Sequence, residues 1–390
     1  MTGRLRLVVL GMMGRSPFGG QTWLYLNWIQ ALRASGHDVY YVEDDTVWPY
    51  DPVTNQITDD CAYAVGHIAR CMEHIGMPNR WAFRFANRKD ACWGMSDGQL
   101  NRLYASSDAL LNIGGATALR DEHARAKLRV YVETDPVTVE LRLAAGDQVD
   151  DWVLTDHDVF ATYAENYGAP DCGVPLLGID FLKTRQPIDL DLWPPVFTPD
   201  ADRFTTIGNY RQTGKDVLFQ GDIYSWSKHL QWERISDLPA RTRQRFELAL
   251  YAEDPQDVRH LRSKGWEVRS PLQFSLDVFG AYPQYIRDSR AELTVAKDQN
   301  VRLRSGWFSE RDVCYLASGK PVVAQETGFS NIIPTGEGLF PFTNSDEALE
   351  AVSRINDDYA RQCKGARALA EEYFDGRKIA ARLLEDIGLT

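Results

Sequence analysis

The sequence has few cysteines and no long apolar run. Its six cysteines are scattered and show no C-x-x-C spacing, which argues against both a zinc site and a disulfide framework. No apolar run approaches the roughly 20 residues that a membrane span requires. Residues Met1–Arg6 lead directly into a short strand, so we expect no signal peptide. We therefore expect a reduced, cytoplasmic protein without a membrane span.

Positive charge is also scarce. Lysine and arginine number 43 against 55 aspartates and glutamates, and the net charge of −12 disfavours a broad surface for nucleic acid or anionic lipid. The remaining composition, 44% hydrophobic and 25% charged, is that of a folded globular protein. A chain of 390 residues is too long for one ordinary core and suggests two domains of about 150–200 residues each.

Proline marks the predicted boundary between the two domains. A stretch with few periodic apolar residues contains Pro187, Pro194, Pro195 and Pro199. The chain is therefore predicted to divide into an N-terminal domain, a linker, a C-terminal domain and a final helix, over residues 1–186, 187–202, 203–370 and 371–390.

The chain opens with a predicted β-α-β unit. A strand over Arg4–Leu10 is followed by a glycine-rich loop, a helix over Gln21–Ser35 and a second strand over His37–Val42. The loop is neither a P-loop nor a clean G-x-G-x-x-G motif. Its adjacent Gly19 and Gly20 would let the backbone approach a phosphate or a sugar at the helix N-terminus. The alternative is a tight turn selected for packing alone.

Acidic residues and a histidine follow further strands of the N-terminal half. These strands are predicted over Asp108–Ile113, Leu128–Val132 and Trp152–Leu154. Ligands bind at the carboxyl ends of parallel strands, which places Asp135 and His157 at a candidate site. His157, flanked by Asp156 and Asp158, is the first candidate for acid–base work because the ordinary pKa of histidine lies near neutrality. Asp135 is the alternative base, and a purely structural role is the competing interpretation of the histidine.

The second half repeats the alternation of strands and helices. Strands are predicted over Phe204–Gly208, Glu247–Ala252, Trp266–Arg269, Ala291–Ala296 and Pro321–Ala324. Helices are predicted over Trp232–Phe246, Pro255–Lys264, Leu276–Arg287 and Ser309–Ala317, and over 345–389 with breaks near 357 and 374–376. A long polar loop, Tyr210–Lys228, follows the first of these strands and carries Arg211 and Lys228.

The stretch from Val295 to Phe342 carries the most specific pattern. It contains A-S-G-K-P-V-V-A-Q-E-T-G at 317–328, followed by an apolar segment at 332–339 and a helix start at 345–352. The order of these elements resembles the nucleotide-sugar-binding core of retaining, family-four-like glycosyltransferases with the GT-B fold. The resemblance implies two Rossmann-like α/β domains that face each other across a cleft. It also implies that the final helix crosses back to the first domain.

The resemblance further implies an activity and a set of site residues. The activity is transfer of a sugar from a nucleotide-sugar donor to a hydroxyl-bearing acceptor, with retention and without a metal ion or other cofactor. Lys228 and Arg211 would stabilise the departing diphosphate. The donor would also contact the loop with Gly19 and Gly20. Further donor-binding positions are Lys297, Ser309, Glu310, Arg311, Glu326, Thr327 and Gly328.

One departure from the family pattern keeps other functions open. The family usually has a glutamate that holds the donor ribose where this chain has Cys314, so Glu310 or Asp312 would have to replace it. The alternatives are a sugar-nucleotide epimerase of the same fold and a non-catalytic sugar-nucleotide-binding protein. Glu326 could likewise cap a turn instead of contacting the donor. The acceptor, whether a small molecule, a glycan or a modified base, is expected to contact the aromatic-rich segment Val47–Ala91.

Overall fold

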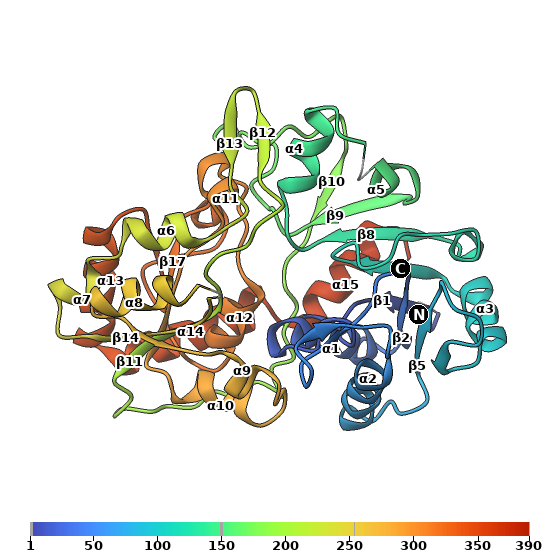
Figure 1. Cartoon of the computed structure of the whole chain (residues 1–390), viewed down its shortest axis with the longest axis horizontal. Helices are drawn as coiled ribbons and strands as arrows, with labels where there is room; N and C mark the ends of the chain where they lie inside the picture. Colours follow the sequence, from blue (N-terminus) through green and yellow to red (C-terminus); the bar gives the residue numbers. More distant parts are fainter. Residues whose placement is uncertain (1–2, 149–150, 253, 390) are drawn as a thin grey trace.

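Two main sheets, one in each half of the chain, organise the protein (Figure 1). The structure is a computed structural model that describes residues 3–148, 151–252 and 254–389. The N-terminal sheet has eight strands in the order β10-β9-β8-β7-β1-β2-β5-β6, and only β6 runs antiparallel to its neighbour. The strands are β1 (Arg6–Leu10), β2 (Asp38–Asp45), β5 (Trp81–Phe85), β6 (Cys92–Gly94), β7 (Ala109–Ile113), β8 (Arg129–Glu133), β9 (Val159–Thr162) and β10 (Phe181–Lys183).

Helices and a small hairpin complete the N-terminal half. The helices are α1 (Gly19–Ala34), α2 (Ala62–His74), α3 (Asp97–Ser106), the 3₁₀ turn η1 (His123–Arg125), α4 (Thr138–Ala144) and α5 (Asp151–Thr155). The hairpin pairs β3 (Tyr50–Asp51) with β4 (Gln56–Ile57). The central strands β1 and β7 are mostly apolar and almost wholly buried, as expected for parallel strands covered by helices.

The C-terminal sheet has six strands, all parallel, in the order β15-β14-β11-β16-β17-β18. They are β11 (Arg203–Asn209), β14 (Arg245–Tyr251), β15 (Glu267–Arg269), β16 (Ala291–Thr294), β17 (Val322–Gln325) and β18 (Leu339–Phe342). A separate hairpin pairs β12 (Val217–Phe219) with β13 (Asp222–Tyr224). The helices are α6 (His229–Arg234), α7 (Leu238–Arg241), α8 (Pro255–Ser263), α9 (Leu272–Ser275), α10 (Ala281–Asp288), α11 (Asp298–Leu303), α12 (Glu310–Ala317), the 3₁₀ turn η2 (Phe329–Asn331), α13 (Ser345–Asp357), α14 (Tyr359–Tyr373) and α15 (Gly376–Asp386). No described helix is long and apolar enough to cross a bilayer.

Four predicted elements are wrong in type or extent. The predicted strand Trp152–Leu154 is the helix α5, because three apolar residues are too few to distinguish the two periods. The predicted helix 232–246 is two short helices, and β14 already begins at Arg245. The polar loop 210–228 contains the β12–β13 hairpin. Helix α10 begins at Ala281 and not at Leu276.

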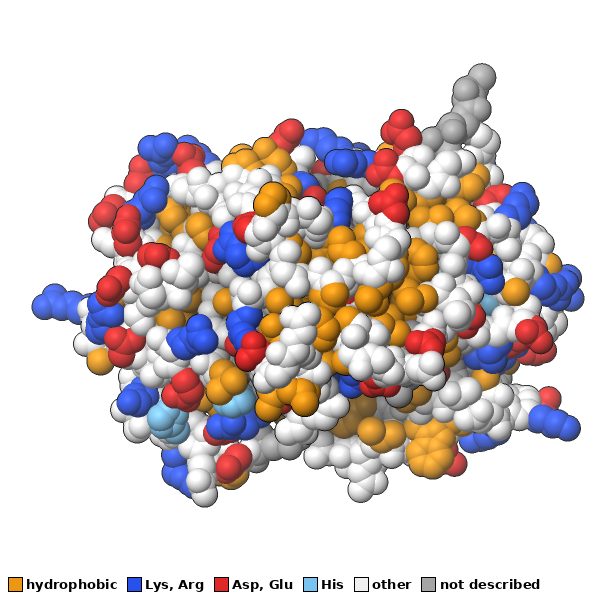
Figure 2. Space-filling view, turned by 90° about the horizontal axis from the view of Figure 1, so that it is seen from above, with side chains coloured by type: hydrophobic (Ala, Val, Ile, Leu, Met, Phe, Trp, Pro, Cys, Tyr) orange, Lys and Arg blue, Asp and Glu red, His pale blue; other side chains and the backbone are white. Residues whose placement is uncertain are grey.

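Both ends of the C-terminal half reach the N-terminal half. Helix α15 packs against α1 (Figure 1), where a Cβ at Gly376 would lie 3.0 Å from the Cβ of Ala31. The β12–β13 hairpin packs against α4 through Val217 and Tyr224, which share a buried cluster with Leu141. Figure 2, which looks onto the side of the molecule that carries this hairpin, shows hydrophobic side chains gathered at the centre of the face. The domain boundaries themselves stay a prediction.

Candidate functional site

A cavity of about 920 Å³ lies between the two halves and is lined by both. Strand ends and helix starts supply its walls: the ends of β7, β8 and β11, the start of α1 and the start of α12. This is where parallel α/β sheets bind ligands. Of the predicted site residues, the lining includes Gly20, Asp135, Lys228, Lys297, Ser309, Glu310 and Arg311.

Helix α12 brings three of these residues to the cavity at its first turn. Ser309 is the N-cap, and its hydroxyl accepts a hydrogen bond from the backbone N–H of Arg311 at 3.3 Å. The carboxylate of Asp312 accepts one from the N–H of Ser309, also at 3.3 Å, and completes a capping box. The box fixes where the helix begins, so Glu310 and Arg311 leave the first turn toward the cavity.

Lys228 is a cation that faces the cavity without a carboxylate partner. Its Nζ lies 5.4 Å from the centroid of the Trp307 ring, and no carboxylate of the described residues forms an ion pair with it. Burial and, to a smaller extent, the nearby Arg311 lower the pKa of Lys228 to about 7. A half-buried cation without a partner is unfavourable, so this position is suited to an anionic ligand.

Lys297 and Asp135 form an ion pair across the cavity. The ammonium group of Lys297 donates a hydrogen bond to Asp135 and lies 2.9 Å from the centroid of the Trp226 ring. Burial lowers the pKa of Lys297 to about 8, although the carboxylate of Asp135 acts in the opposite direction. Lys297, which is predicted to bind the donor phosphate, and Asp135, the predicted alternative base, therefore neutralise each other's charge in this structure.

Arg311 is held in place by buried partners. Its guanidinium is ion-paired with Glu292, and it donates to the hydroxyl of Thr294 at 2.6 Å. It also donates to the backbone carbonyl of Ile207. These bonds fix Arg311 as a rigid positive charge at the cavity wall, close enough to influence the pKa of Lys228.

Glu310 is a cavity carboxyl group with one unoccupied oxygen. Its Oε1 accepts a hydrogen bond from Nδ2 of Asn27 at 3.1 Å, which ties α12 to α1. Burial raises the pKa of Glu310 to about 8, and this single hydrogen bond opposes the shift. Its Oε2 is buried and has no hydrogen-bond partner among the described residues.

Two further cavity residues carry buried oxygen atoms without a partner. They are Gln21 through Oε1 and Asp135 through Oδ1. Together with Glu310 Oε2, these are the only cavity-lining side-chain atoms that the described part of the chain leaves buried and unbonded. The oxygens of Gln21 and Asp135 are acceptors, whereas Glu310, with its raised pKa, can also donate through a protonated Oε2. Within the described residues, the cavity thus presents unused hydrogen-bonding groups beside a cation without a carboxylate partner.

Gly19 and Gly20 form the first turn of α1 and have different surroundings. Gly20 lines the cavity, whereas Gly19 packs beneath the ring of Tyr282 from α10. The N–H of Gly19 donates to the hydroxyl of Ser275 at 3.2 Å, so this turn also joins the two halves. Packing explains Gly19, and only Gly20 remains at the ligand-facing surface.

Replacing Gly19 with alanine is expected to destabilise the protein by about 1–3 kcal/mol, because the new methyl would overpack a filled site. Its Cβ would lie 2.4 Å from the buried ring of Tyr282. Gly20→Ala is the matched control, since its Cβ would lie 3.5 Å from the hydroxyl of Tyr282. Urea unfolding measures both variants. Equal midpoints for the two variants would contradict the packing role of Gly19.

His157 lies behind the cavity wall and not in it. Its Nδ1 donates to the backbone carbonyl of Val153 at 2.9 Å, so its Nε2 accepts from Nδ2 of Asn112 at 3.0 Å. Burial lowers its pKa, which favours the neutral ring. Asp158 is paired with Arg129 instead of with the imidazole. This geometry argues against the predicted acid–base role of His157.

Arg211 is bound elsewhere. Its guanidinium makes hydrogen bonds of 2.6 and 3.0 Å to the carboxylate of Asp257 and does not line the cavity. Of the two residues predicted to stabilise the departing diphosphate, only Lys228 therefore lines the cavity.

The turn Glu326-Thr327-Gly328 also lies outside the cavity lining. Glu326 accepts a hydrogen bond from the N–H of Gly328. This contact matches the alternative interpretation, in which Glu326 caps the turn instead of contacting the donor. Gly328 has φ +98°, and a Cβ there would lie 2.7 Å from Nδ2 of Asn166. The hydroxyl of Thr327 donates to the carbonyl of Trp307 at 2.6 Å. These residues support the cavity wall from behind.

The position of the family's ribose-binding glutamate, Cys314, is fully buried on α12 and does not face the cavity. Of the two suggested replacements, Glu310 lines the cavity and Asp312 serves as a cap. Aromatic lining residues outside the predicted site include Tyr131, Trp152, Trp226 and Trp307. Trp226 and Trp307 had a signal in the sequence, since both lie beside the predicted basic clusters.

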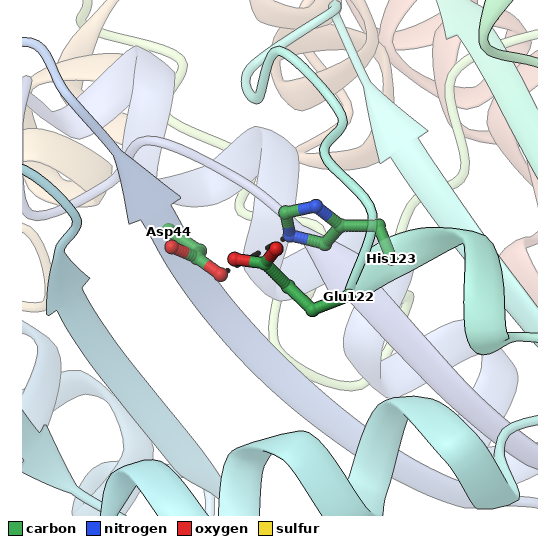
Figure 3. Close-up of side chains that lie close together, drawn as sticks. All are labelled: Asp44, Glu122 and His123. Carbon is green, nitrogen blue, oxygen red and sulfur yellow. Dashed lines mark hydrogen bonds and ion pairs between the residues drawn. The ribbon is translucent and has the colours of Figure 1, made fainter.

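Asp44, Glu122 and His123 converge near the end of β2, away from the cavity (Figure 3). Their oxygen and nitrogen atoms are close enough to suggest a metal site. However, Asp44 already binds the guanidinium groups of Arg84 and Arg120. Nδ1 of His123 accepts from the N–H of Arg120 at 2.9 Å, so its Nε2 donates to Asp44 at 3.1 Å. With two fixed cations and both ring nitrogens bonded, the cluster is a buried ion network and a poor fit for a metal ion.

Comparisons with known proteins agree on the fold. No family model matches the sequence, and no curated protein matches it. Among solved structures, HepE from Anabaena in complex with UDP-glucose is 15% identical, with a TM-score of 0.57 over 99% of this chain and 100% of HepE. An α-glucosyltransferase in complex with UDP and a 13-mer DNA containing an HMU base is 11% identical, with a TM-score of 0.58 over 99% of this chain and 100% of that chain. Sucrose-phosphate synthase from Thermosynechococcus elongatus is 12% identical, with a TM-score of 0.51 over 98% of both chains. The chain therefore has the two-domain GT-B fold of these glycosyltransferases, which confirms the fold class predicted from its sequence.

Proposed function

We propose that the protein is a glycosyltransferase that moves a sugar from a nucleotide-sugar donor to a hydroxyl group of an acceptor. The observation that carries the proposal is the set of unpaired groups in one cavity. Among the described residues, Lys228 has no carboxylate partner, and Gln21, Asp135 and Glu310 each have a buried polar atom without a hydrogen-bond partner. A nucleotide sugar has the complementary groups, since its diphosphate is anionic and its sugar and ribose hydroxyls both donate and accept hydrogen bonds.

The charged wall of the cavity is suited to the departure of a diphosphate. Arg311 is fixed by Glu292, so its charge is in place before the reaction begins. A bound diphosphate would raise the lowered pKa of Lys228 and keep its ammonium group charged. Positive charge set in advance stabilises the negative charge that develops on the leaving oxygen. We further propose that Lys297 leaves Asp135 and pairs with the phosphate when the donor binds. The carboxylate of Asp135 would then be free to accept a hydrogen bond from a hydroxyl group.

Two similar proteins support this class of substrate without fixing it. HepE is solved with UDP-glucose, and the α-glucosyltransferase is solved with UDP and DNA. Screening this protein against UDP-, GDP- and ADP-sugars would test the proposal. Transfer of the sugar to an added acceptor would support the proposal. Formation of an epimer of the donor sugar alone would indicate an epimerase instead. Binding without any turnover would indicate a non-catalytic sugar-nucleotide-binding protein.

The product is expected to keep the anomeric configuration of the donor. Retention does not require a carboxylate that attacks the sugar as a nucleophile. The departing phosphate oxygen can take the proton of the acceptor hydroxyl on the same face of the sugar. Proton NMR coupling constants of the new glycosidic bond measure the outcome. An inverted product would refute retention and would make Asp135 the general base, because it is the predicted base that lines the cavity.

A further inference from the structure

The β12–β13 hairpin lies between the two halves of the chain and is held by both (Figure 1). Its strands are joined by Gln220 and Gly221, which have φ values of 51° and 88°. Two residues with positive φ form the tight turn whose twist matches that of a hairpin. Arg302 on α11 donates a hydrogen bond to the carbonyl of Ile223 at 2.8 Å, and α4 of the N-terminal half packs against β12. The base of the hairpin is therefore fixed beside the cavity.

One carboxylate organises this base. Asp216 accepts hydrogen bonds from the N–H of Trp226 at 2.8 Å and from the hydroxyl of Ser225 at 3.1 Å. These bonds hold Trp226, which is buried, in the cavity wall. Lys215 precedes Asp216 in the chain and also lines the cavity, but it is exposed to solvent. Among the described residues, Lys215 forms no ion pair, either with Asp216 or with another carboxylate.

The ring of Trp226 contacts two ammonium groups. Nζ of Lys297 lies 2.9 Å from the ring centroid, and Nζ of Lys215 lies 4.5 Å from it. An aromatic ring attracts a cation without neutralising its charge. Burial and, to a smaller extent, repulsion from Lys215 lower the pKa of Lys297. Asp135 is the counter-ion of Lys297, so Lys215 is the member of this pair that lacks one.

The cavity has more positive charge than the proposed donor uses. The ionisable lysine, arginine, aspartate and glutamate residues of its lining are Asp135, Arg142, Lys215, Lys228, Lys297, Glu310 and Arg311. Glu292 neutralises Arg311 from behind. Lys228 and Lys297 provide one ammonium group for each phosphate group of a bound donor. Lys215 then remains at the solvent-exposed edge of the cavity without an anion.

We propose that Lys215 binds a further anionic group, a carboxylate or a phosphate, on one of the two substrates. This inference rests on the proposed function and narrows its substrate class to an anionic sugar. The charge comes either from a uronic acid on the donor or from a phosphate or carboxylate on the acceptor. The net charge of −12 repels anions at long range, so an unpaired lysine at the cavity supplies the local attraction that such a substrate needs.

Two calorimetric titrations of the whole protein distinguish the two sources of charge. The donor titration compares UDP-glucuronate with UDP-glucose, and GDP-mannuronate with GDP-mannose. The acceptor titration compares glucose 6-phosphate, fructose 6-phosphate and glucuronate with glucose and fructose. It is run with saturating UDP, GDP or ADP, whichever binds, so that a sugar phosphate cannot occupy the diphosphate site. In one of the titrations, a charged sugar should bind about 10-fold more tightly than its neutral counterpart, the effect of one charge-assisted hydrogen bond.

Substitutions at Lys215 connect this preference to the hairpin. Lys215→Met should abolish the preference for the charged sugar, whereas Lys215→Arg keeps the charge and should retain it. Lys264→Met is the matched control, because Lys264 is exposed at the end of α8 and does not line the cavity. It should keep the wild-type preference. Urea unfolding of Lys215→Met should match wild type, since the side chain is exposed, and this guards against a folding defect.

Two results would overturn the inference. The first is the absence of a preference for a charged sugar in both titrations, in a protein that binds a nucleotide sugar. The second is a preference that persists in Lys215→Met, including the case in which charged and neutral ligands lose affinity equally, which would make Lys215 a further ligand of the diphosphate. Binding of UDP-, GDP- and ADP-glucose is measured separately, so failure of all three identifies failure of the proposed function instead.

Discussion

Replacing Lys228 with methionine is expected to lower turnover by about 10²- to 10³-fold, because the charge that meets the departing diphosphate is lost. The same change should stabilise the unliganded protein. Folding lowers the pKa of Lys228 from 10.5 to about 7 through burial. The unfolded chain therefore binds the proton more tightly, and the buried charge destabilises the native state fully below pH 7 and progressively less as pH rises toward 10.5.

The matched control for this prediction is Lys264→Met, because Lys264 is an exposed residue at the end of α8. Steady-state turnover and thermal unfolding at pH 6 and pH 9 measure both variants. The stability gain of Lys228→Met should be larger at pH 6. Wild-type turnover in Lys228→Met, or a change in stability that is the same at pH 6 and pH 9, would show that Lys228 is an ordinary surface cation.

Replacing Glu310 with glutamine is expected to lower turnover about 10- to 100-fold above pH 8, where the wild-type carboxylate is ionised and binds a donor hydroxyl more strongly than a neutral amide does. Its effect on stability should depend on pH. Burial raises the pKa of Glu310 from 4.5 to about 8, so the native state binds more protons than the unfolded state between these values. Wild-type stability therefore falls as pH rises through this window, and Glu310→Gln removes that contribution.

Thermal unfolding of Glu310→Gln and wild type across pH 5 to 9 measures this pH-dependent effect on stability. The variant should gain stability over wild type as pH rises. Glu350→Gln, at an exposed position of α13, is the control and should follow the wild-type curve. Parallel curves for Glu310→Gln and wild type would mean that Glu310 is ionised and solvated in the folded protein.

The sequence was sufficient where local patterns determine structure. The box formed by Ser309 and Asp312 fixes the start of α12, and the apolar run of β17 behind it is a typical buried parallel strand. These elements place Glu310 and Arg311 at the cavity as predicted positions. Local chemistry and tertiary structure agree there, so the start of α12 could be predicted from the chain alone, while donor binding by Glu310 and Arg311 stays a prediction.

The surroundings of a residue could not be predicted where a distant partner decides them. Arg211 looks like a free cation in the sequence, but Asp257, 46 residues later, binds it. His157 follows a buried segment, yet its distance from the cavity depends on whether residues 152–154 form a strand or a helix.

The assignment of the cavity to a nucleotide sugar is tested most directly by calorimetric titration with UDP-, GDP- and ADP-glucose and with the matching nucleosides. At least one nucleotide sugar should bind well and its nucleoside much more weakly, because Lys228 meets the diphosphate. This difference should shrink in Lys228→Met and persist in Lys264→Met. Binding of no nucleotide sugar, or equal binding of a nucleotide sugar and its nucleoside, would contradict the assignment.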